Sequence, residues 1–155
     1  MTPSLRLSLL VLALPSVGCE EPETCEEDIR AQVLDERVEI TLEGRMLVAE
    51  LADDAVERDR GWRHRLCDRE ALLLVPDQAP EALGIWGCAL SEPLDAVFIA
   101  EGEVIAVERI EPCPEPCSSC PIVGQALEVD AVLELPLDPD NPAPAPGASA
   151  DFELP

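Results

Sequence analysis

The strongest constraint on the fold is a pair of apolar segments separated by a two-residue turn. Residues 94–100 and 103–108 are both rich in Val, Ile and Phe, which favour strands over helices. Glu101 and Gly102 lie between them, and two such segments around a short turn that contains glycine predict a β-hairpin. We therefore expect a mainly β protein whose other segments pack against this hairpin.

Three further strands are predicted upstream of the hairpin. Residues 37–42 alternate between apolar and polar side chains, and residues 46–51 form a second run after Gly44. Two such runs around a turn predict a first hairpin. Residues 71–75 form a continuous apolar run that ends before Pro76. This run is too short for a helix and suits a central strand.

The last strand is predicted at residues 125–135, which alternate again and which we expect to close the sheet. One face of this strand would carry Leu127, Val129, Ala131, Leu133 and Leu135. From residue 137 the composition changes to Asp, Pro and Ala, which favours extended, unpacked backbone. We expect residues 137–155 to be a disordered tail in solvent.

A short helix is predicted between the first hairpin and the central strand. Asp53 or Asp54 can cap its start, and Glu57 lies three residues after Asp54, as in a capping box. Gly61 is a suitable end for the helix. Arg58 lies on this helix, where it either pairs with neighbouring acids or lines a ligand site.

Length and charge limit the class of protein. A chain of 155 residues has room for one domain, which we place at residues 36–136. Acidic residues number 33 against 10 basic ones, which gives a formal net charge of −23. Such a surface repels phosphate backbones, so nucleic acid is not an expected partner.

The first residues have the pattern of an export signal. Arg6 precedes a short apolar run at residues 7–14, which suits the core of a signal peptide and is too short to span a bilayer. Small residues before Cys19 resemble a bacterial lipobox, so residues 1–18 would be removed and Cys19 would be lipidated. Ordinary cleavage with Cys19 unlipidated is the alternative. Residues 19–35 are expected to form an acidic tether.

Several short motifs, in matching order, resemble the DUF192 family. The most specific is Trp86 followed by Pro93-Leu94-Asp95 and an apolar strand, which is similar to the family pattern W-M-K-N-T-x-x-P-L-D. The other matching pieces are residues 48–50, 57–61, 72–75, 112–113, 120–121 and 127–129. The resemblance covers residues 46–131 and implies a small, mostly antiparallel β-barrel or sandwich-like domain with one or two short helices.

The resemblance implies no established activity, and this chain departs from the family pattern. Cys88 and Ala89 stand where the family has Lys and Asn, so a site built on those polar residues would be altered here. Trp86 and Asp95 remain candidate ligand or pocket residues together with Arg58. Trp62, which replaces an apolar residue of the family, is expected in the core or in a pocket wall.

Cysteine is abundant for a chain of this length. If Cys19 is lipidated, six cysteines remain for disulfides: Cys25, Cys67, Cys88, Cys113, Cys117 and Cys120. An even number in an exported protein indicates bridges, but fifteen pairings are possible. The family's own cysteines imply that Cys113 bonds to Cys117 or Cys120. Cys88 would then bond to the remaining member, and Cys25 to Cys67.

Two other uses of the cysteines stay open. Cys117 and Cys120 have the spacing of a redox-active C-x-x-C pair, although Pro121 argues against the helix that usually follows. A zinc site made by Cys88, Cys113, Cys117 and Cys120 is the other possibility. An exported protein favours structural disulfides over both.

The sequence therefore predicts an exported, membrane-anchored lipoprotein on the periplasmic or outer surface of a bacterial envelope. Its disulfide-stapled β domain is expected to have a binding or accessory role, with a small ligand or an envelope protein as partner. No cofactor is predicted, and no nucleophile–base, phosphate-loop or dinucleotide motif supports catalysis.

Overall fold

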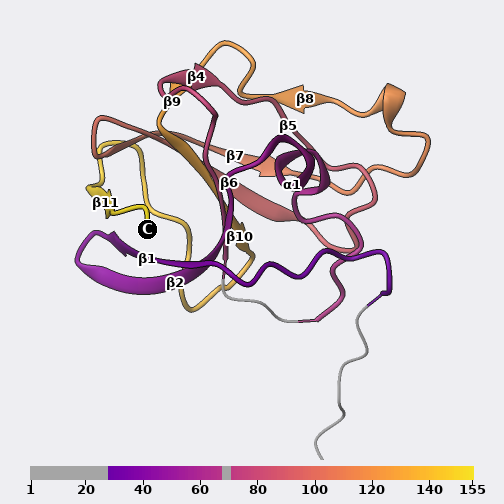
Figure 1. Cartoon of the computed structure of the whole chain (residues 1–155), viewed down its shortest axis with the longest axis horizontal. Helices are drawn as coiled ribbons and strands as arrows, with labels where there is room; N and C mark the ends of the chain where they lie inside the picture. The colour runs from indigo at the N-terminus through magenta and orange to yellow at the C-terminus, as the bar shows by residue number, and fades with distance from the viewer. Residues whose placement is uncertain (1–27, 68–70) are drawn as a thin grey trace, which may run out of the picture.

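The computed structural model describes residues 28–67 and 71–155. The predicted signal peptide at residues 1–18, the predicted lipidation site Cys19, and Cys25 lie outside the described residues. One seven-stranded sheet dominates the fold, in the order β11-β1-β2-β3-β10-β6-β7, and two short two-stranded sheets, β4-β9 and β5-β8, accompany it (Figure 1). The elements are β1 Arg37–Leu42, β2 Arg45–Ala52, α1 Ala55–Arg60, β3 Leu72–Leu74, β4 Glu81–Ala82, β5 Ile85–Trp86, β6 Leu94–Ala100, β7 Glu103–Ile110, the 3₁₀ turn η1 Cys117–Ser119, β8 Ile122–Val123, β9 Glu128–Val129, β10 Ala131–Pro136 and β11 Ala150–Phe152.

Both predicted hairpins are confirmed, and their turns explain their register. Glu43 and Gly44 between β1 and β2 have φ angles of 49° and 78°. Glu101 and Gly102 between β6 and β7 have φ angles of 52° and 75°. Two consecutive residues with positive φ form the tight turn whose twist matches that of antiparallel strands. Leu42 consequently pairs with Arg45.

The C-terminal segment joins the two edges of the curled sheet. The Ser149 carbonyl accepts a hydrogen bond from Glu43 N on the β1 side at 3.0 Å. The Ala148 carbonyl accepts one from Val104 N on β7 at 2.8 Å. Ala150 is buried, and β11 pairs with β1. The prediction of a disordered tail at residues 137–155 is therefore wrong for this segment, because backbone pairing to an exposed strand edge needs little apolar composition.

The strand that we expected to close the sheet is β10, and it lies in the centre of the sheet, between β3 and β6. The predicted alternation also breaks at Asp130, where Asp130 N donates to Ile99 O at 2.8 Å and the Asp130 carboxylate accepts from Glu101 N at 2.7 Å. As a result Val129 and Leu133 pack in different apolar clusters, whereas the prediction placed them on one face.

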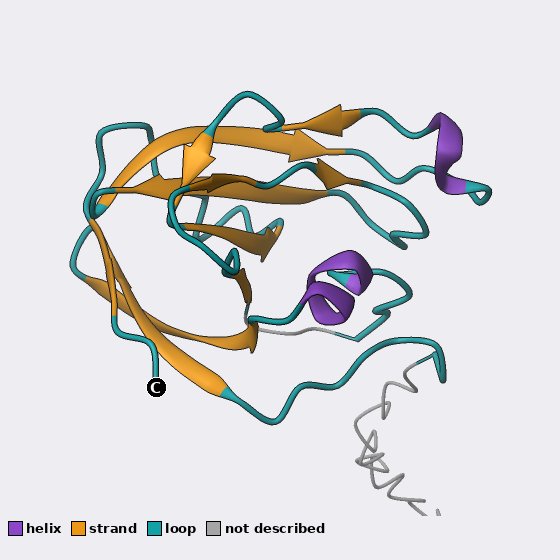
Figure 2. Ribbon diagram, turned by 45° about the horizontal axis from the view of Figure 1, so that its top comes forward, coloured by secondary structure: helices purple, strands orange, loops and turns teal. Residues whose placement is uncertain are grey.

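The central strands send alternate side chains into two separate apolar clusters. Leu73, Val97 and Leu133 belong to a cluster that also takes residues from β1, β2, β7 and β11. Leu72, Phe98 and Val132 point to the other face, in a second cluster that includes residues of β5, β9 and the loop after α1. We call the first side the apolar face and the second the pocket face. Figure 2 shows α1 beside the curled sheet.

Helix α1 is capped as its sequence predicts. The Asp54 carboxylate accepts hydrogen bonds from Val56 N at 2.7 Å and Glu57 N at 2.8 Å. In return, the Glu57 carboxylate accepts a hydrogen bond from Asp53 N, one residue before the cap, at 3.3 Å. Gly61 ends the helix with φ 47°. No helix among residues 28–67 and 71–155 has both the length and the apolar character that crossing a membrane requires.

The described part of the predicted tether, residues 28–35, packs on the domain. Gln32 is buried, and its side-chain amide donates to Glu57 O at 3.0 Å and Gly61 O at 2.9 Å. Leu34 is also buried, in the cluster of the pocket face. The tether prediction is thus wrong for these residues, because Gln32 and Leu34 are buried against the domain.

Candidate functional site

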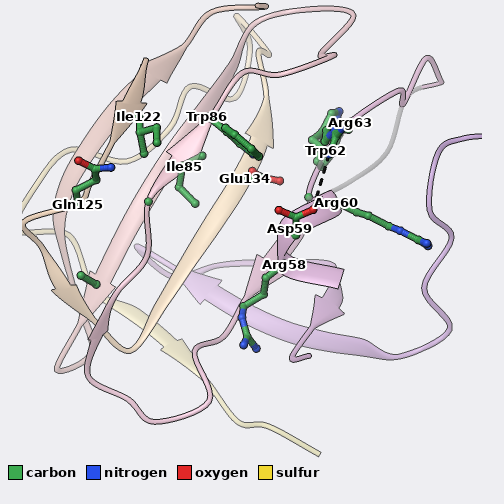
Figure 3. Close-up of a pocket in the computed structure, with 13 residues that line it drawn as sticks. Arg58, Asp59, Arg60, Trp62, Arg63, Ile85, Trp86, Ile122, Gln125 and Glu134 are labelled. Carbon is green, nitrogen blue, oxygen red and sulfur yellow. Dashed lines mark ion pairs between the residues drawn. The ribbon is translucent and has the colours of Figure 1, made fainter. Parts of the chain in front are cut away.

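A pocket of about 530 Å³ lies on the pocket face between α1 and the short sheet β5-β8 (Figure 3). Its lining comes from the helix and the loop after it, from β4 and β5, from the region of β8, and from β10. The lining residues are Arg58, Asp59, Arg60, Gly61, Trp62, Arg63, Ala82, Gly84, Ile85, Trp86, Ile122, Gln125 and Glu134.

Two tryptophans form aromatic walls of this pocket, and they are the only two in the chain. Trp86 is held by the antiparallel pairing of β5 with β8, in which it lies opposite Ile122. Trp62 follows the end of α1 and is 8% exposed. The predictions that Trp86 lies in a pocket and that Trp62 lies in the core or a pocket wall agree with these positions.

Glu134 is the distinctive polar residue of the pocket. It lies on β10 opposite Leu72 of β3 and Ala96 of β6, and it is 4% exposed. Its Oε2 atom has no hydrogen-bond partner among the described residues. Burial raises the pKa of the Glu134 carboxyl to about 7, although the nearby Arg65 cation and the backbone N–H of Trp62 act in the opposite direction. A carboxyl of this kind can accept or donate a hydrogen bond near neutral pH.

Gly61 lets the end of α1 approach Glu134. A Cβ atom at this position would lie 3.4 Å from Glu134 Oε1 and 3.5 Å from Oε2. The φ angle of 47° is also one that residues with side chains rarely adopt. Glycine therefore satisfies the turn that ends the helix and leaves room for the carboxyl beneath it.

A buried arginine links the pocket to the neighbouring strand β2. Arg65 is 1% exposed, and its Nη2 atom lies 2.9 Å from Glu50 Oε2. Its guanidinium also lies 5.0 Å from the centre of the Trp62 ring. Glu50 and Glu134 both register with Leu72, from opposite sides of β3. Arg65 thus compensates buried negative charge along one row of the pocket face.

Two arginines that line the pocket pair with acids other than Glu134. Arg58 donates to Val75 O at 2.9 Å and pairs with Asp77 at 2.8 Å. Arg63 pairs with Asp59 at 3.8 Å. In Figure 3 the side chains of Arg58 and Arg60 extend away from the Glu134 carboxyl. Arg58 therefore pairs with an acid and also lines the pocket.

Asp95 does not belong to this pocket. It lies on β6 opposite Arg109 of β7, and Arg109 Nε donates to its carboxylate at 2.7 Å. This contact raises the pKa of Arg109. The hypothesis that Asp95 is a pocket residue is thus not supported, because a cross-strand partner directly opposite satisfies its charge.

One disulfide joins the segment after β5 to the segment between β7 and β8, and a second closes a loop within that latter segment. Cys88 bonds to Cys117, and Cys113 bonds to Cys120. This pairing of the four cysteines is one of those that the family resemblance implies. Cys67 is disulfide-bonded as well, whereas its predicted partner Cys25 lies outside the described residues.

The two alternative uses of the cysteines gain no support from this pairing. Cys117 and Cys120 belong to different bridges, so the C-x-x-C spacing does not form a disulfide of its own. The four cysteines of the zinc hypothesis are consumed in two bridges, and a disulfide sulfur is not the thiolate that zinc binds.

Sequence reasoning missed Glu134, Glu50 and Arg65. The available signal for Glu134 was a single acid inside the apolar run of residues 131–135. Glu134 is buried because β10 lies in the centre of the sheet and the face that carries Glu134 is covered. Alternation along the strand does not predict that cover.

Fold and site together define a small curled-sheet domain, closed by its C-terminal segment, with one helix beside a pocket. The sequence profile of DUF192, a family described as "Uncharacterized ACR", matches residues 38–138. The chain therefore belongs to the DUF192 family. No functionally curated protein matches it.

Two solved structures share this fold. One, from Sinorhizobium meliloti 1021, is described as a "putative transcription regulator". It is 22% identical and has a TM-score of 0.59, and the match covers 78% of this chain and 97% of that one. The other is a protein of unknown function from Novosphingobium aromaticivorans DSM 12444. It is 22% identical with a TM-score of 0.53, over 74% and 83% of the two chains. At this identity the likeness shows the fold alone.

Proposed function

We propose that this chain is a lipid-anchored envelope protein whose β domain binds a small molecule in the pocket beside α1. The observation that carries the binding role is Glu134, a 4% exposed carboxyl with an unpartnered oxygen in a pocket of about 530 Å³. An unsatisfied buried polar atom costs about 1–3 kcal/mol. A ligand that supplies the missing donor removes that cost.

The pocket lining favours binding over covalent catalysis. It includes no Ser, Thr, Cys, Lys or His among the described residues, so hydroxyl, thiol, amine and imidazole nucleophiles do not accompany the carboxyl. It does include two tryptophans, which offer large apolar surfaces to a ligand. Pockets of several hundred Å³ with apolar walls and few polar groups are typical small-molecule sites.

The proposed location depends on the N-terminal sequence. A basic residue at Arg6, the apolar residues 7–14 and a small residue at Gly18 before Cys19 are the parts of a lipoprotein signal. Lipid on Cys19 would make the membrane the first partner of the protein, since two acyl chains suffice for stable anchoring. Nucleic acid stays an unexpected partner at a net charge of −23.

Tryptophan fluorescence tests the binding role directly. The chain has two tryptophans and no tyrosine, and both tryptophans line the pocket, so intrinsic emission reports on this site. We expect some members of a small-molecule panel to change the emission of the full chain saturably. Ala82→Phe, which adds bulk to the lining, should weaken those responses.

Val56→Phe is the matched control, because Val56 is 59% exposed on α1 and does not line the pocket. It should leave every response unchanged. Responses that both variants leave intact would contradict binding in this pocket.

Mass spectrometry and cell fractionation test the anchor. We expect the protein from a bacterial envelope to begin at Cys19 and to carry acyl chains, and Cys19→Ser to move it to the soluble fraction. An unacylated protein cut at another residue would contradict the lipoprotein proposal and leave the binding role intact.

A further inference from the structure

Resting on the proposed function, we infer that the pocket binds a small organic ammonium ion with an apolar body, with its N–H groups directed at Glu134. The inference concerns the chemical class of the ligand. It follows from the charges, the aromatic rings and the unpartnered oxygen inside the pocket.

The negative end of the site is Glu134. Its Oε2 atom is buried and lacks a partner among the described residues. A buried carboxylate is best satisfied by a charged donor, because charge-assisted hydrogen bonds are about twice as strong as neutral ones. A ligand carboxylate at the same place would meet a like charge or a shared proton.

Two arginines of the lining, Arg58 and Arg63, pair with acids other than Glu134. Arg58 bonds to Val75 O and Asp77, and Arg63 pairs with Asp59 and, at 3.6 Å, with Glu115. Figure 3 shows Arg60 extending away from the Glu134 carboxyl. None of these three arginines forms an ion pair with Glu134 among the described residues. The net charge of −23 attracts cations at longer range.

The aromatic walls suit both parts of such a ligand. Ring faces attract cations, and tryptophan does so most strongly. Trp62 already shows this property, since the Arg65 guanidinium lies 5.0 Å from its ring centre. Trp86 and Glu134 both line the pocket (Figure 3). Trp86, Ile85 and Ile122 offer apolar surface for the body of the ligand.

The charge state of Glu134 should make the affinity for the ligand depend on pH. The groups that face it are Arg65 and Arg63 from the loop after α1, Asp59 from α1 and, across β3, Glu50. With a pKa of about 7, the ionised fraction rises about tenfold between about pH 6 and about pH 8. An ammonium ion binds the ionised form, so its apparent affinity should rise by the same factor.

Three probes of matched shape test the ligand class: cyclohexylmethylammonium, cyclohexylmethanol and cyclohexanecarboxylate. Each is titrated into the full chain while tryptophan emission is followed. At about pH 8 we expect the ammonium to bind at least about tenfold more tightly than the other two probes. Its affinity should fall about tenfold at about pH 6, and this second arm needs no substitution.

Glu134→Gln should abolish both the preference for the ammonium and its pH dependence. Glu108→Gln is the matched control, because Glu108 is exposed and registers opposite Ala96 in the same row of the sheet. It should change neither result.

The outcomes separate the two proposals. Equal binding of the three probes, tighter binding of the carboxylate, or an ammonium affinity that does not change with pH would overturn the ligand class and leave the pocket as a binding site. If no probe changes the emission of the wild-type chain at either pH, the proposed binding role itself fails.

Discussion

The central strands β3, β6 and β10 contribute to both faces of the sheet, but among the described residues only one of these faces buries charged side chains. On the apolar face, Leu73, Val97 and Leu133 pack with residues from both edges of the curled sheet. On the pocket face, the same strands carry Leu72, Ala96 and Glu134. The four buried polar residues among those described are associated with this second face: Gln32, Glu50, Arg65 and Glu134.

The difference shows where stability and binding capacity reside. Apolar burial stabilises the first face without any partner requirement, at about 25 cal/mol per Å². The second face buries charges whose desolvation must be offset by Arg65 and Trp62, and Glu134 keeps one oxygen unsatisfied. Sites for ligands are commonly built at such costly positions.

The largest effect is expected from breaking the buried ion pair. Arg65→Met leaves Glu50 buried without its 2.9 Å partner, and should lower the free energy of unfolding by about 3–5 kcal/mol. Arg63→Met is the control, since Arg63 is partly exposed and its ion pairs span 3.6 and 3.8 Å. It should cost less than about 1 kcal/mol. Urea unfolding measures both, and equal losses would contradict a special role for Arg65.

The apolar face should respond to lost volume. Leu133→Ala should cost about 2–5 kcal/mol, because Leu133 is fully buried in a cluster that cannot collapse freely. The same urea unfolding, carried out at several pH values, should give the same loss each time. A loss that varies with pH would show that this face also depends on charge.

The pocket face should show the complementary pH dependence. Glu134 has a pKa of about 7 when folded against 4.5 as its ordinary value, so the folded state binds the proton more tightly. Its contribution to stability is intact below about pH 4.5 and is lost as the pH rises to about 7, by about 3 kcal/mol. Glu134→Gln should therefore gain about 3 kcal/mol relative to wild type over that range. A constant difference would contradict the raised pKa.

The smallest effect compares the two disulfides beside the pocket. Cys88 and Cys117 are 29 residues apart, and Cys113 and Cys120 are 7 apart. Replacing the first pair with Ala should cost about 1 kcal/mol more than replacing the second, because a longer loop gains more entropy in the unfolded chain. Thermal unfolding of both double variants checks this. The reverse order would indicate strain or residual structure in place of loop entropy.

Local signals predicted the elements that depend on local chemistry. Gly44 and Gly102 mark the two hairpin turns, and Asp54 and Gly61 mark the ends of α1. Each of these residues acts on backbone within a few positions of itself, so the turn or helix end that it forms can be predicted from a single sequence.

The site could not be predicted in the same way because it depends on distant pairing. Reading residues 125–135 as one strand ignored the break at Asp130, which is set by hydrogen bonds to Ile99 and Glu101. The central position of β10, which buries Glu134, was not predicted. The pairing of Ala150–Phe152 with β1 depends likewise on an edge that only the folded sheet presents.

A carboxyl-detected NMR titration of the full chain tests the central claim most directly, with Glu134→Gln identifying the signal of Glu134. We expect a titration midpoint near pH 7 for this carboxyl, because it is buried in the pocket with one oxygen unpartnered. A midpoint near the ordinary value of about 4.5 would mean that Glu134 is solvated or fully paired, and would contradict a pocket built around it.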